Sequence, residues 1–286
     1  MMDAFTGLSL EGRTALVTGS SKNLGRATAE LLAARGARVV VHASAPSAEL
    51  SAVAEGIVAA GGEAIALSAE LGSDQGVAEL VSGVASTYGS IDILVNNAAI
   101  RPRRLLEELE LHEWRRVMSV NLEAAFLLSR AFVPGMADRG WGRVVNVAGA
   151  DAFWGKPTKP HVVSANLGKI GLMRSIAVRY GPRGVTANAV VPGAMATTRT
   201  HSLHNYPDLR TGFRRLLARV PAGRAGEPWE LAEVVAFLAA PAAGYVSGQT
   251  LHVSGGAFPT TADAMAEPAV DDAAVEAFIG AALDGS

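Results

Sequence analysis

The sequence carries a glycine-rich turn of the kind that binds phosphate groups. The turn follows the β-branched run Thr14–Thr18. Its residues are Gly19, Ser20, Ser21, Lys22, Asn23, Leu24 and Gly25. Between a buried strand and the start of a helix, such a turn brings backbone N–H groups close to a pyrophosphate at the positive end of the helix. We therefore expect this segment to bind a dinucleotide.

The residue types exclude several other chemistries. The chain has no cysteine, which excludes thiolate catalysis, disulfide frameworks and cysteine-ligated metal sites. Its 6 histidines lack the spacing and acidic companions of a metal site, so no metal is expected. The net charge of -2 comes from well-mixed charges, which predicts neither a nucleic acid nor a membrane as partner. Residues Met1–Leu10 have no signal-peptide pattern, so we expect a cytoplasmic protein.

The elements that position the turn follow from the hydrophobic pattern. Of the 286 residues, 49% are apolar, enough for a large core. Short β-branched runs alternate with stretches of helical period such as Leu24–Arg35 and Glu107–Asp138. The runs are continuous, as in strands covered on both faces, and their spacing predicts right-handed crossovers in an α/β fold with one parallel sheet. The seven runs are Thr14–Thr18, Arg38–Ala43, Glu63–Ser68, Ile93–Asn97, Arg143–Val147, Thr186–Val191 and Thr250–Val253.

No shift in composition marks a second domain, so we expect a single domain over residues 1–256. Residues 194–224 follow the sixth strand as a long insertion that is polar at first, which is typical of a substrate lid. Residues 257–286 form a C-terminal extension, partly helical because Asp271–Leu283 has an Asp cap and apolar residues at helical spacing.

Further motifs resemble those of the short-chain dehydrogenase/reductase family, and they occur in the family's order over residues 8–256. The turn at Thr18–Gly25 matches the family's TGxxxGxG pattern, although Asn23 replaces the middle glycine. The other motifs are Asn96-Asn97-Ala98-Ala99, Val120-Asn121, Pro192-Gly193 with Thr197, and Gly248–Gly256. The resemblance implies a Rossmann-type, doubly wound parallel sheet of seven strands with helices on both faces.

The resemblance also implies a nucleotide site for NADP(H). The second strand ends at His42-Ala43-Ser44 without the carboxylate that would bind an adenosine ribose, and Lys22 is available for a 2′-phosphate. Glu70 stands where the family has an aspartate near the adenine. The residues that the resemblance assigns to the cofactor are Gly19, Ser21, Lys22, Asn23, Leu24, Gly25, Ser44, Glu70, Leu71, Asn97, Ala98, Pro192, Gly193 and Thr197.

The catalytic positions of the family hold different residues in this chain. Family members use a serine, a tyrosine, a lysine four residues after the tyrosine, and an asparagine. These positions fall at Gly149, Val162, Asn166 and Asn121, so only the asparagine is retained. No Tyr-x-x-x-Lys sequence occurs anywhere in the chain.

Other residues could take over the movement of protons. His161 directly precedes the vacant tyrosine position, and a histidine can act as acid or base near neutral pH. Lys169 lies on roughly the same helical face as Val162, so its ammonium could replace the missing charge. Tyr206 lies in the expected lid. The candidate catalytic residues are thus His161, Asn121, Tyr206 and Lys169. Each also has a structural interpretation, such as a helix cap, a subunit contact or a solvated loop.

Three function classes remain open from the sequence. The main expectation is a non-redox enzyme (a cyclase, isomerase or lyase) that acts on a small carbonyl or polyene substrate, with the NADP(H) site retained or a relic. The alternative is an NADPH-dependent carbonyl oxidoreductase with a non-standard proton donor. The second alternative is a non-catalytic partner of an active relative. The family's usual assembly surface predicts a homodimer or homotetramer through the fourth and fifth helices.

Overall fold

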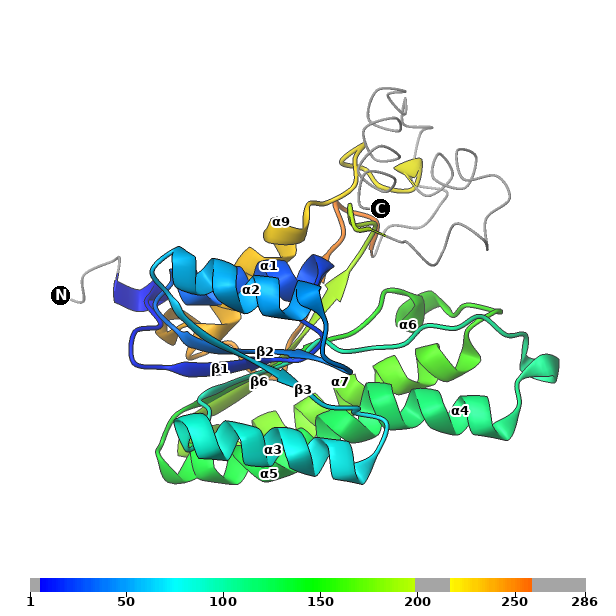
Figure 1. The fold of residues 1–286 in the computed structure, drawn as a ribbon. Helices are drawn as coiled ribbons and strands as arrows, with labels where there is room; N and C mark the ends of the chain where they lie inside the picture. Colours follow the sequence, from blue (N-terminus) through cyan, green and yellow to red (C-terminus); the bar gives the residue numbers. More distant parts are fainter. Residues whose placement is uncertain (1–5, 199–216, 259–286) are drawn as a thin grey trace.

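The computed structural model describes residues 6–198 and 217–258, and within them one seven-stranded sheet forms the centre of the molecule (Figure 1). The strand order is β3-β2-β1-β4-β5-β6-β7, and every pairing is parallel. The strands are β1 (Thr14–Val17), β2 (Arg38–Ala43), β3 (Glu63–Ser68), β4 (Ile93–Asn96), β5 (Gly142–Val147), β6 (Val185–Pro192) and β7 (Thr250–Val253). The predicted Rossmann-type α/β fold is confirmed.

Helices cover both faces of this sheet. One face carries α1 (Asn23–Ala34), α2 (Ala48–Ala59) and α9 (Pro228–Ala239), and the other carries α3 (Asp74–Tyr88), α5 (Ala124–Asp138) and α7 (Pro160–Tyr180) (Figure 1). The remaining segments are α4 (Leu111–Met118), α6 (Asp151–Trp154), the π-helical turn η3 (Ser119–Glu123) and the 3-10 turns η1 (Thr6–Leu8), η2 (Leu106–Glu108), η4 (Gly181–Arg183) and η6 (Pro241–Ala243). Because each face is covered, β1, β4 and β5 are buried along their whole lengths, which explains their unbroken apolar runs.

The long helix expected over Glu107–Asp138 is shorter and less regular than its periodicity predicts. It begins at Leu111 and contains the π-helical turn at Ser119–Glu123. By length and composition alone, the 28-residue stretch Leu111–Asp138 could cross a membrane, since it contains an 18-residue window with a mean hydropathy of 1.2. The 18-residue window that qualifies is 50% buried inside the protein, and a core helix passes the same test.

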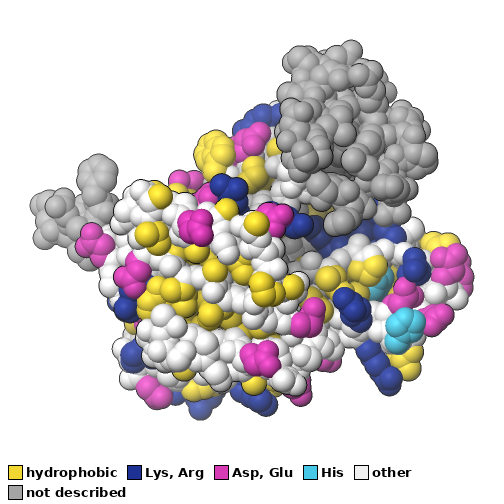
Figure 2. All heavy atoms as spheres, viewed as in Figure 1, with side chains coloured by type: hydrophobic (Ala, Val, Ile, Leu, Met, Phe, Trp, Pro, Cys, Tyr) yellow, Lys and Arg dark blue, Asp and Glu magenta, His cyan; other side chains and the backbone are white. Residues whose placement is uncertain are grey.

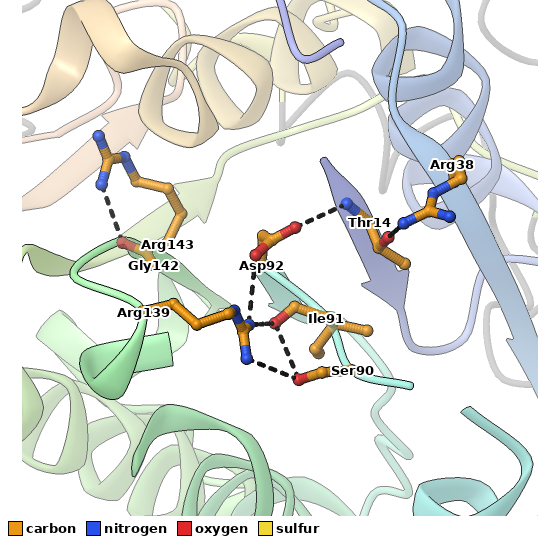
Figure 3. Close-up of polar contacts among 8 residues, drawn as sticks. All are labelled: Thr14, Arg38, Ser90, Ile91, Asp92, Arg139, Gly142 and Arg143. Atoms are coloured by element: carbon orange, nitrogen blue, oxygen red, sulfur yellow. Dashed lines mark hydrogen bonds and ion pairs between the residues drawn. The ribbon is translucent and has the colours of Figure 1, made fainter. Parts of the chain in front are cut away.

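A polar network ties the central strands together at their amino-terminal ends (Figure 3). The Asp92 carboxylate accepts a hydrogen bond from the backbone N–H of Thr14 at 3.1 Å, which joins the loop before β4 to β1. Arg139 donates to the backbone oxygen of Ile91 at 2.7 Å and to Asp92 at 3.2 Å. This end of the sheet is therefore fixed by structural contacts.

The opposite, carboxyl-terminal edge of the sheet is where a ligand is expected. The strand order reverses between β1 and β4, and ligands of doubly wound folds bind outside the carboxyl ends of the strands at such a switch point. The loops that follow β1, β4, β5 and β6 converge here. Of the expected lid at 194–224, the structure describes residues 194–198 and 217–224. Tyr206 lies outside the described residues, as do residues 259–286 of the C-terminal extension.

Candidate active site

The glycine turn leaves the first turn of α1 open to a ligand. Gly19 has a φ of 64°, and Asn23 is the one residue other than glycine in the described ranges with a positive φ, 52°. Lys22 occupies the N-cap position of α1 and makes no capping hydrogen bond with its side chain. The first N–H groups of a helix have no partner inside the helix, so this start can receive an anion.

The floor of the turn is built by close packing. A Cβ on Gly25 would collide with the backbone oxygen of Gly19, and one on Gly19 would lie 2.9 Å from the Cα of Ala98. The Asn97 side chain donates to the backbone oxygens of Thr18, at 2.9 Å, and Gly19, at 3.0 Å. Asn97 and Ala98, both assigned to the cofactor by the sequence, therefore support the turn from β4.

Asn23 also connects the turn to the segment after β6. Its Oδ1 accepts hydrogen bonds from the backbone N–H and the hydroxyl of Thr198, both at 2.9 Å. Its Nδ2 donates to the backbone oxygen of Thr198 at 3.2 Å. The residue that replaces the family's middle glycine thus holds the beginning of the expected lid against the start of α1.

His42, at the end of β2, is a part of this site that the sequence did not reveal. Its Nδ1 accepts a hydrogen bond from the backbone N–H of Gly19 at 3.2 Å, and its Nε2 lies 3.0 Å from the backbone oxygen of Ala69. Burial lowers the pKa of His42 to about 4, so the ring is neutral at pH 7. A neutral ring with Nε2–H as donor satisfies both contacts.

The remaining predicted cofactor residues lie around this turn. Lys22 and Ser44 are exposed, and Ser21 is half-buried. Leu24, in the first turn of α1, packs against the core. Glu70 accepts a hydrogen bond from the backbone N–H of Gly72 at 2.9 Å. Leu71 and Ala98 line a cavity of about 10 Å³. Pro192, Gly193 and Thr197 are half-buried after β6, and the Gly193 N–H donates to the backbone oxygen of Val253 at 2.9 Å.

Val162, at the family's tyrosine position, faces apolar side chains. It is 2% exposed. The other members of its cluster are Val117, Ala165, Ile100, Met118 and Leu122. Asn121 lies in the π-helical turn, and its carboxamide is engaged at both ends with the backbone of Ile100, at 2.8 and 2.9 Å. Asn121 therefore fixes the loop after β4 against Val162.

Asn166 on α7 lies beside Gly149, which follows β5. Its Nδ2 is 2.7 Å from the point where a Cβ on Gly149 would lie. The Asn166 side chain makes no hydrogen bond to any residue within 6–198 or 217–258 and is 5% exposed overall. A carboxamide N–H donor thus occupies the space that a residue larger than glycine would need at position 149. This contact could not be predicted from the sequence pattern, because it depends on how α7 packs on β5.

Lys169 brings a positive charge into the same region. It is 1% exposed, and its Nζ donates to the backbone oxygen of Val147 at 2.5 Å. Burial, with a smaller effect of the nearby Arg101 guanidinium, lowers the pKa of Lys169 to about 8. No carboxylate within the described ranges pairs with Lys169. Its positive charge would therefore attract an anionic group bound at the end of β5.

His161 is also buried, without a polar partner. It has an exposed fraction of 0%, and neither ring nitrogen has a hydrogen-bond partner within the described part of the chain. Burial is the main reason why the pKa of His161 is lowered, while Glu113 on α4 opposes this effect. The ring is therefore neutral at pH 7, and whether it moves protons stays a prediction, as it does for Tyr206.

The strand order and the helices on both faces place the protein in the doubly wound α/β class, and comparisons with known proteins identify its family. Residues 19–257 match the family model described as enoyl-(acyl carrier protein) reductase. A solved protein described as a short chain dehydrogenase/reductase family protein is 33% identical, with a TM-score of 0.77, and covers 88% of this chain and 100% of its own. The chain belongs to the short-chain dehydrogenase/reductase family.

Several relatives are named reductases. The 3-oxoacyl-(acyl-carrier-protein) reductase of Vibrio cholerae is 39% identical over 251 residues, which are 88% of this chain and 99% of the relative. The corresponding protein of Escherichia coli is 36% identical over the same shares. A solved 3-oxoacyl (acyl-carrier-protein) reductase of Agrobacterium tumefaciens, with NADP bound, is 30% identical with a TM-score of 0.83 and covers 89% of this chain and 98% of its own.

A relative with a different named substrate is equally similar in structure. The solved putative NAD(P)-dependent gluconate 5-dehydrogenase of Beutenbergia cavernae, with NADP at low occupancy, is 37% identical with a TM-score of 0.82 and covers 89% of this chain and 100% of its own. These relatives carry redox names, so the main expectation of a non-redox cyclase, isomerase or lyase is wrong. The chain is an enzyme of this family. The side chains at the expected catalytic positions do not decide this question, because hydride transfer depends on the cofactor.

Proposed function

We propose that this chain is an NADPH-dependent oxidoreductase that reduces a carbonyl group in a small molecule. The observation that carries the proposal is the uncapped start of α1, with its glycine turn, in a chain that aligns over 88% of its length with a named reductase. Solved relatives in this family bind NADP.

The residues of the turn fit the cofactor. The open N–H groups at the start of α1 suit the pyrophosphate, and the exposed Lys22 suits a 2′-phosphate. Ser44 directly follows β2 and offers no carboxylate that would repel this phosphate. When bound, the cofactor supplies the hydride that reduces the carbonyl carbon.

The chain's own residues must then stabilise the carbonyl oxygen. We assign the serine, tyrosine and lysine positions of the family to Gly149, Val162 and Asn166, so these three side chains offer neither a hydroxyl nor a charge. Asn166 Nδ2 can donate to the carbonyl oxygen from the space beside Gly149. Lys169 follows one turn later on α7 and holds a proton with a pKa of about 8, which suits proton donation near neutral pH.

The structural setting makes His161 a poor acid at pH 7. Its pKa is lowered and its ring nitrogens meet no polar group in the described ranges, so the protonated form is disfavoured. We therefore favour Lys169 as the proton source. We retain from the sequence the proposals of a cytoplasmic homodimer or homotetramer, which would assemble through α4–α5 and α7.

The proposal is tested by measuring hydride transfer from NADPH to the substrate. Purified protein is incubated with ketones and with NADPH that carries deuterium at the transferred position, and the alcohol product is analysed by mass spectrometry. We expect deuterium in the alcohol together with loss of absorbance at about 340 nm. Lys22→Gln should raise KM for NADPH about tenfold and leave KM for NADH unchanged. The control Arg26→Gln, on the exposed side of α1, should alter neither. Unlabelled products across the ketones, or no NADPH oxidation at all, contradict the proposal.

A further inference from the structure

Two loops with many basic residues meet at the carboxyl edge of the sheet. One follows β4 and carries Arg101, Arg103 and Arg104, and the other follows β5 and carries Lys156 and Lys159. The backbone N–H of Arg104 donates to the backbone oxygen of Thr158 at 2.8 Å, which joins the loops. Figure 2 shows Lys and Arg side chains gathered on this part of the surface, beside the grey region.

Two of these cations have acidic partners. Arg104 pairs with Glu113 at 3.0 Å, and Lys159 pairs with Asp151 at 3.4 Å. Arg101 and Lys156 are exposed and form no ion pair within residues 6–198 and 217–258. No carboxylate in the described ranges therefore offsets the positive charges of Arg101 and Lys156.

The uncompensated charge borders the carbonyl site. Arg101 directly follows Ile100, which Asn121 holds by two hydrogen bonds and which packs against Val162. Its guanidinium is close enough to lower the pKa of Lys169 and of Lys159. Arg101 and Lys169 therefore act on the same region, one at the rim and the other beneath it. An anion placed between them would be attracted by both charges.

An apolar surface lies next to the cations. Phe153 and Trp154 form the end of the short helix α6, directly before the loop with Lys156, and are 37% and 53% exposed. The Phe153 ring is held edge-on by His252 of β7, with 4.6 Å between ring centroids. A rigid aromatic wall beside exposed cations suits a ligand that has both an anionic group and an apolar body.

We propose that the site takes carbonyl compounds that also carry a carboxylate or phosphate group, with Arg101 and Lys156 binding the anion and Phe153 and Trp154 contacting the apolar part. The proposal deepens the proposed function and rests on it for the reaction. A low-molecular-weight acid is favoured over an acidic protein because Arg101 and Lys156 lie on the two loops beside Val162.

The test compares ligands that differ only in charge. Binding of 4-oxo-4-phenylbutanoate and of its methyl ester is measured by calorimetry with NADP present, and kcat/KM is measured for both with NADPH. We expect the acid to bind at least about tenfold more tightly than the ester, and this preference should weaken as salt is added. Arg101→Gln and Lys156→Gln should each reduce the preference about threefold or more and leave the affinity for the ester unchanged.

Arg179→Gln is the matched control, because Arg179 is exposed near the other end of α7 and the substitution removes the same charge. An equal affinity for acid and ester overturns the proposal, as does an equal effect of Arg179→Gln. Binding of an acidic carrier protein without any preference for the small acid also overturns it. If the acid binds preferentially but neither compound is reduced, the reductase assignment fails and the anion site stands. If both are reduced with equal kcat/KM and bind equally, the anion site fails alone.

Discussion

The carboxamide of Asn166 fills the space beside Gly149, where its Nδ2 lies 2.7 Å from the position of a Cβ. The two residues therefore depend on each other. A side chain at position 149 would force Asn166 to move, and glycine at this position leaves room for the hydrogen-bond donor of Asn166.

This contact predicts that Gly149→Ala destabilises the protein. The added methyl group forces Asn166 aside, which should lower the free energy of unfolding by about 1–3 kcal/mol. In an Asn166→Ala background the cost should largely disappear, giving a coupling energy of about 1–3 kcal/mol in urea denaturation. The control Gly171→Ala, on the exposed side of α7 with no atom within 4 Å of its Cβ position, should stabilise by about 1 kcal/mol. Additive effects of the 149 and 166 substitutions would contradict the contact.

Asn166→Leu tests the proposed role of the carboxamide in catalysis. Removal of one preorganised donor to a developing oxyanion typically lowers kcat about 10²–10³-fold, and we expect a loss in this range. The affinity for NADPH should not change, because the glycine turn is untouched. Ser164→Ala is the control, since the Ser164 hydroxyl only donates to the backbone oxygen of Pro160 at 2.9 Å. An undiminished kcat in Asn166→Leu would remove Asn166 from the mechanism.

Lys169 should limit activity at high pH. Reduction consumes a proton, so if Lys169 supplies it, kcat is constant below its pKa of about 8 and falls tenfold per pH unit above it. Lys169→Met should lower kcat and abolish this alkaline limb. The pH profile of Lys159→Gln should keep the limb. A wild-type profile that is flat to pH 10 would exclude Lys169 as the donor.

We also expect Lys169 to lower the stability of the fold at neutral pH while it supports activity. The pKa of Lys169 is about 8 in the folded protein, against 10.5 for an exposed lysine, so its burial weakens the fold below pH 8, and the fold regains stability as pH rises from about 8 to 10.5. The size of this effect is about 3 kcal/mol. Lys169→Met should therefore raise the free energy of unfolding at pH 7 while activity falls. A large destabilisation would instead show that the hydrogen bond to Val147 outweighs the buried charge.

The sequence predicted the sheet closely, because strands buried on both faces need unbroken apolar runs and the glycine turn follows the first of them. The strand at Ile93–Asn96 ends one residue earlier than expected, and Val185–Pro192 is one residue longer at each end. The π-helical turn that carries Asn121 was not foreseen, since a π turn leaves no clear trace in apolar periodicity.

The candidate site was less accessible from the sequence. His42 joins Gly19 to Ala69 across three strand ends, and Asn166 meets Gly149 only because α7 packs on β5. Such contacts link residues that are far apart in the chain, so no regular spacing of residues in the sequence predicts them. The sequence shows that no Tyr-x-x-x-Lys motif is present. The absence of this motif does not reveal which reaction the remaining side chains support.

His42 should make the fold sensitive to mild acid. Its pKa is lowered to about 4 in the folded chain, against 6.5 for an exposed histidine, so stability is complete above pH 6.5 and declines as pH falls from 6.5 to about 4. The loss is about 3 kcal/mol. His42→Leu should be less stable at pH 7 by about 1–3 kcal/mol, because the Gly19 N–H loses its acceptor, and should flatten this pH dependence. His112→Gln, at an exposed position on α4, serves as the control in thermal melts. An unchanged acid limb in His42→Leu would mean that another group causes it.

Asn23 should weaken the binding of the cofactor that the turn is suited to hold. Its three hydrogen bonds to Thr198 hold the segment after β6 beside the uncapped start of α1, where a pyrophosphate would bind. Asn23→Gly removes these bonds and suits the φ of 52°, so we expect the Kd for NADPH, measured by fluorescence, to fall about three- to tenfold. Thr198→Val keeps the backbone contacts and loses only the hydroxyl bond, so its effect should be smaller and in the same direction. If Asn23→Gly instead weakens binding, the Asn23–Thr198 contact prepares the site for the cofactor rather than obstructing it.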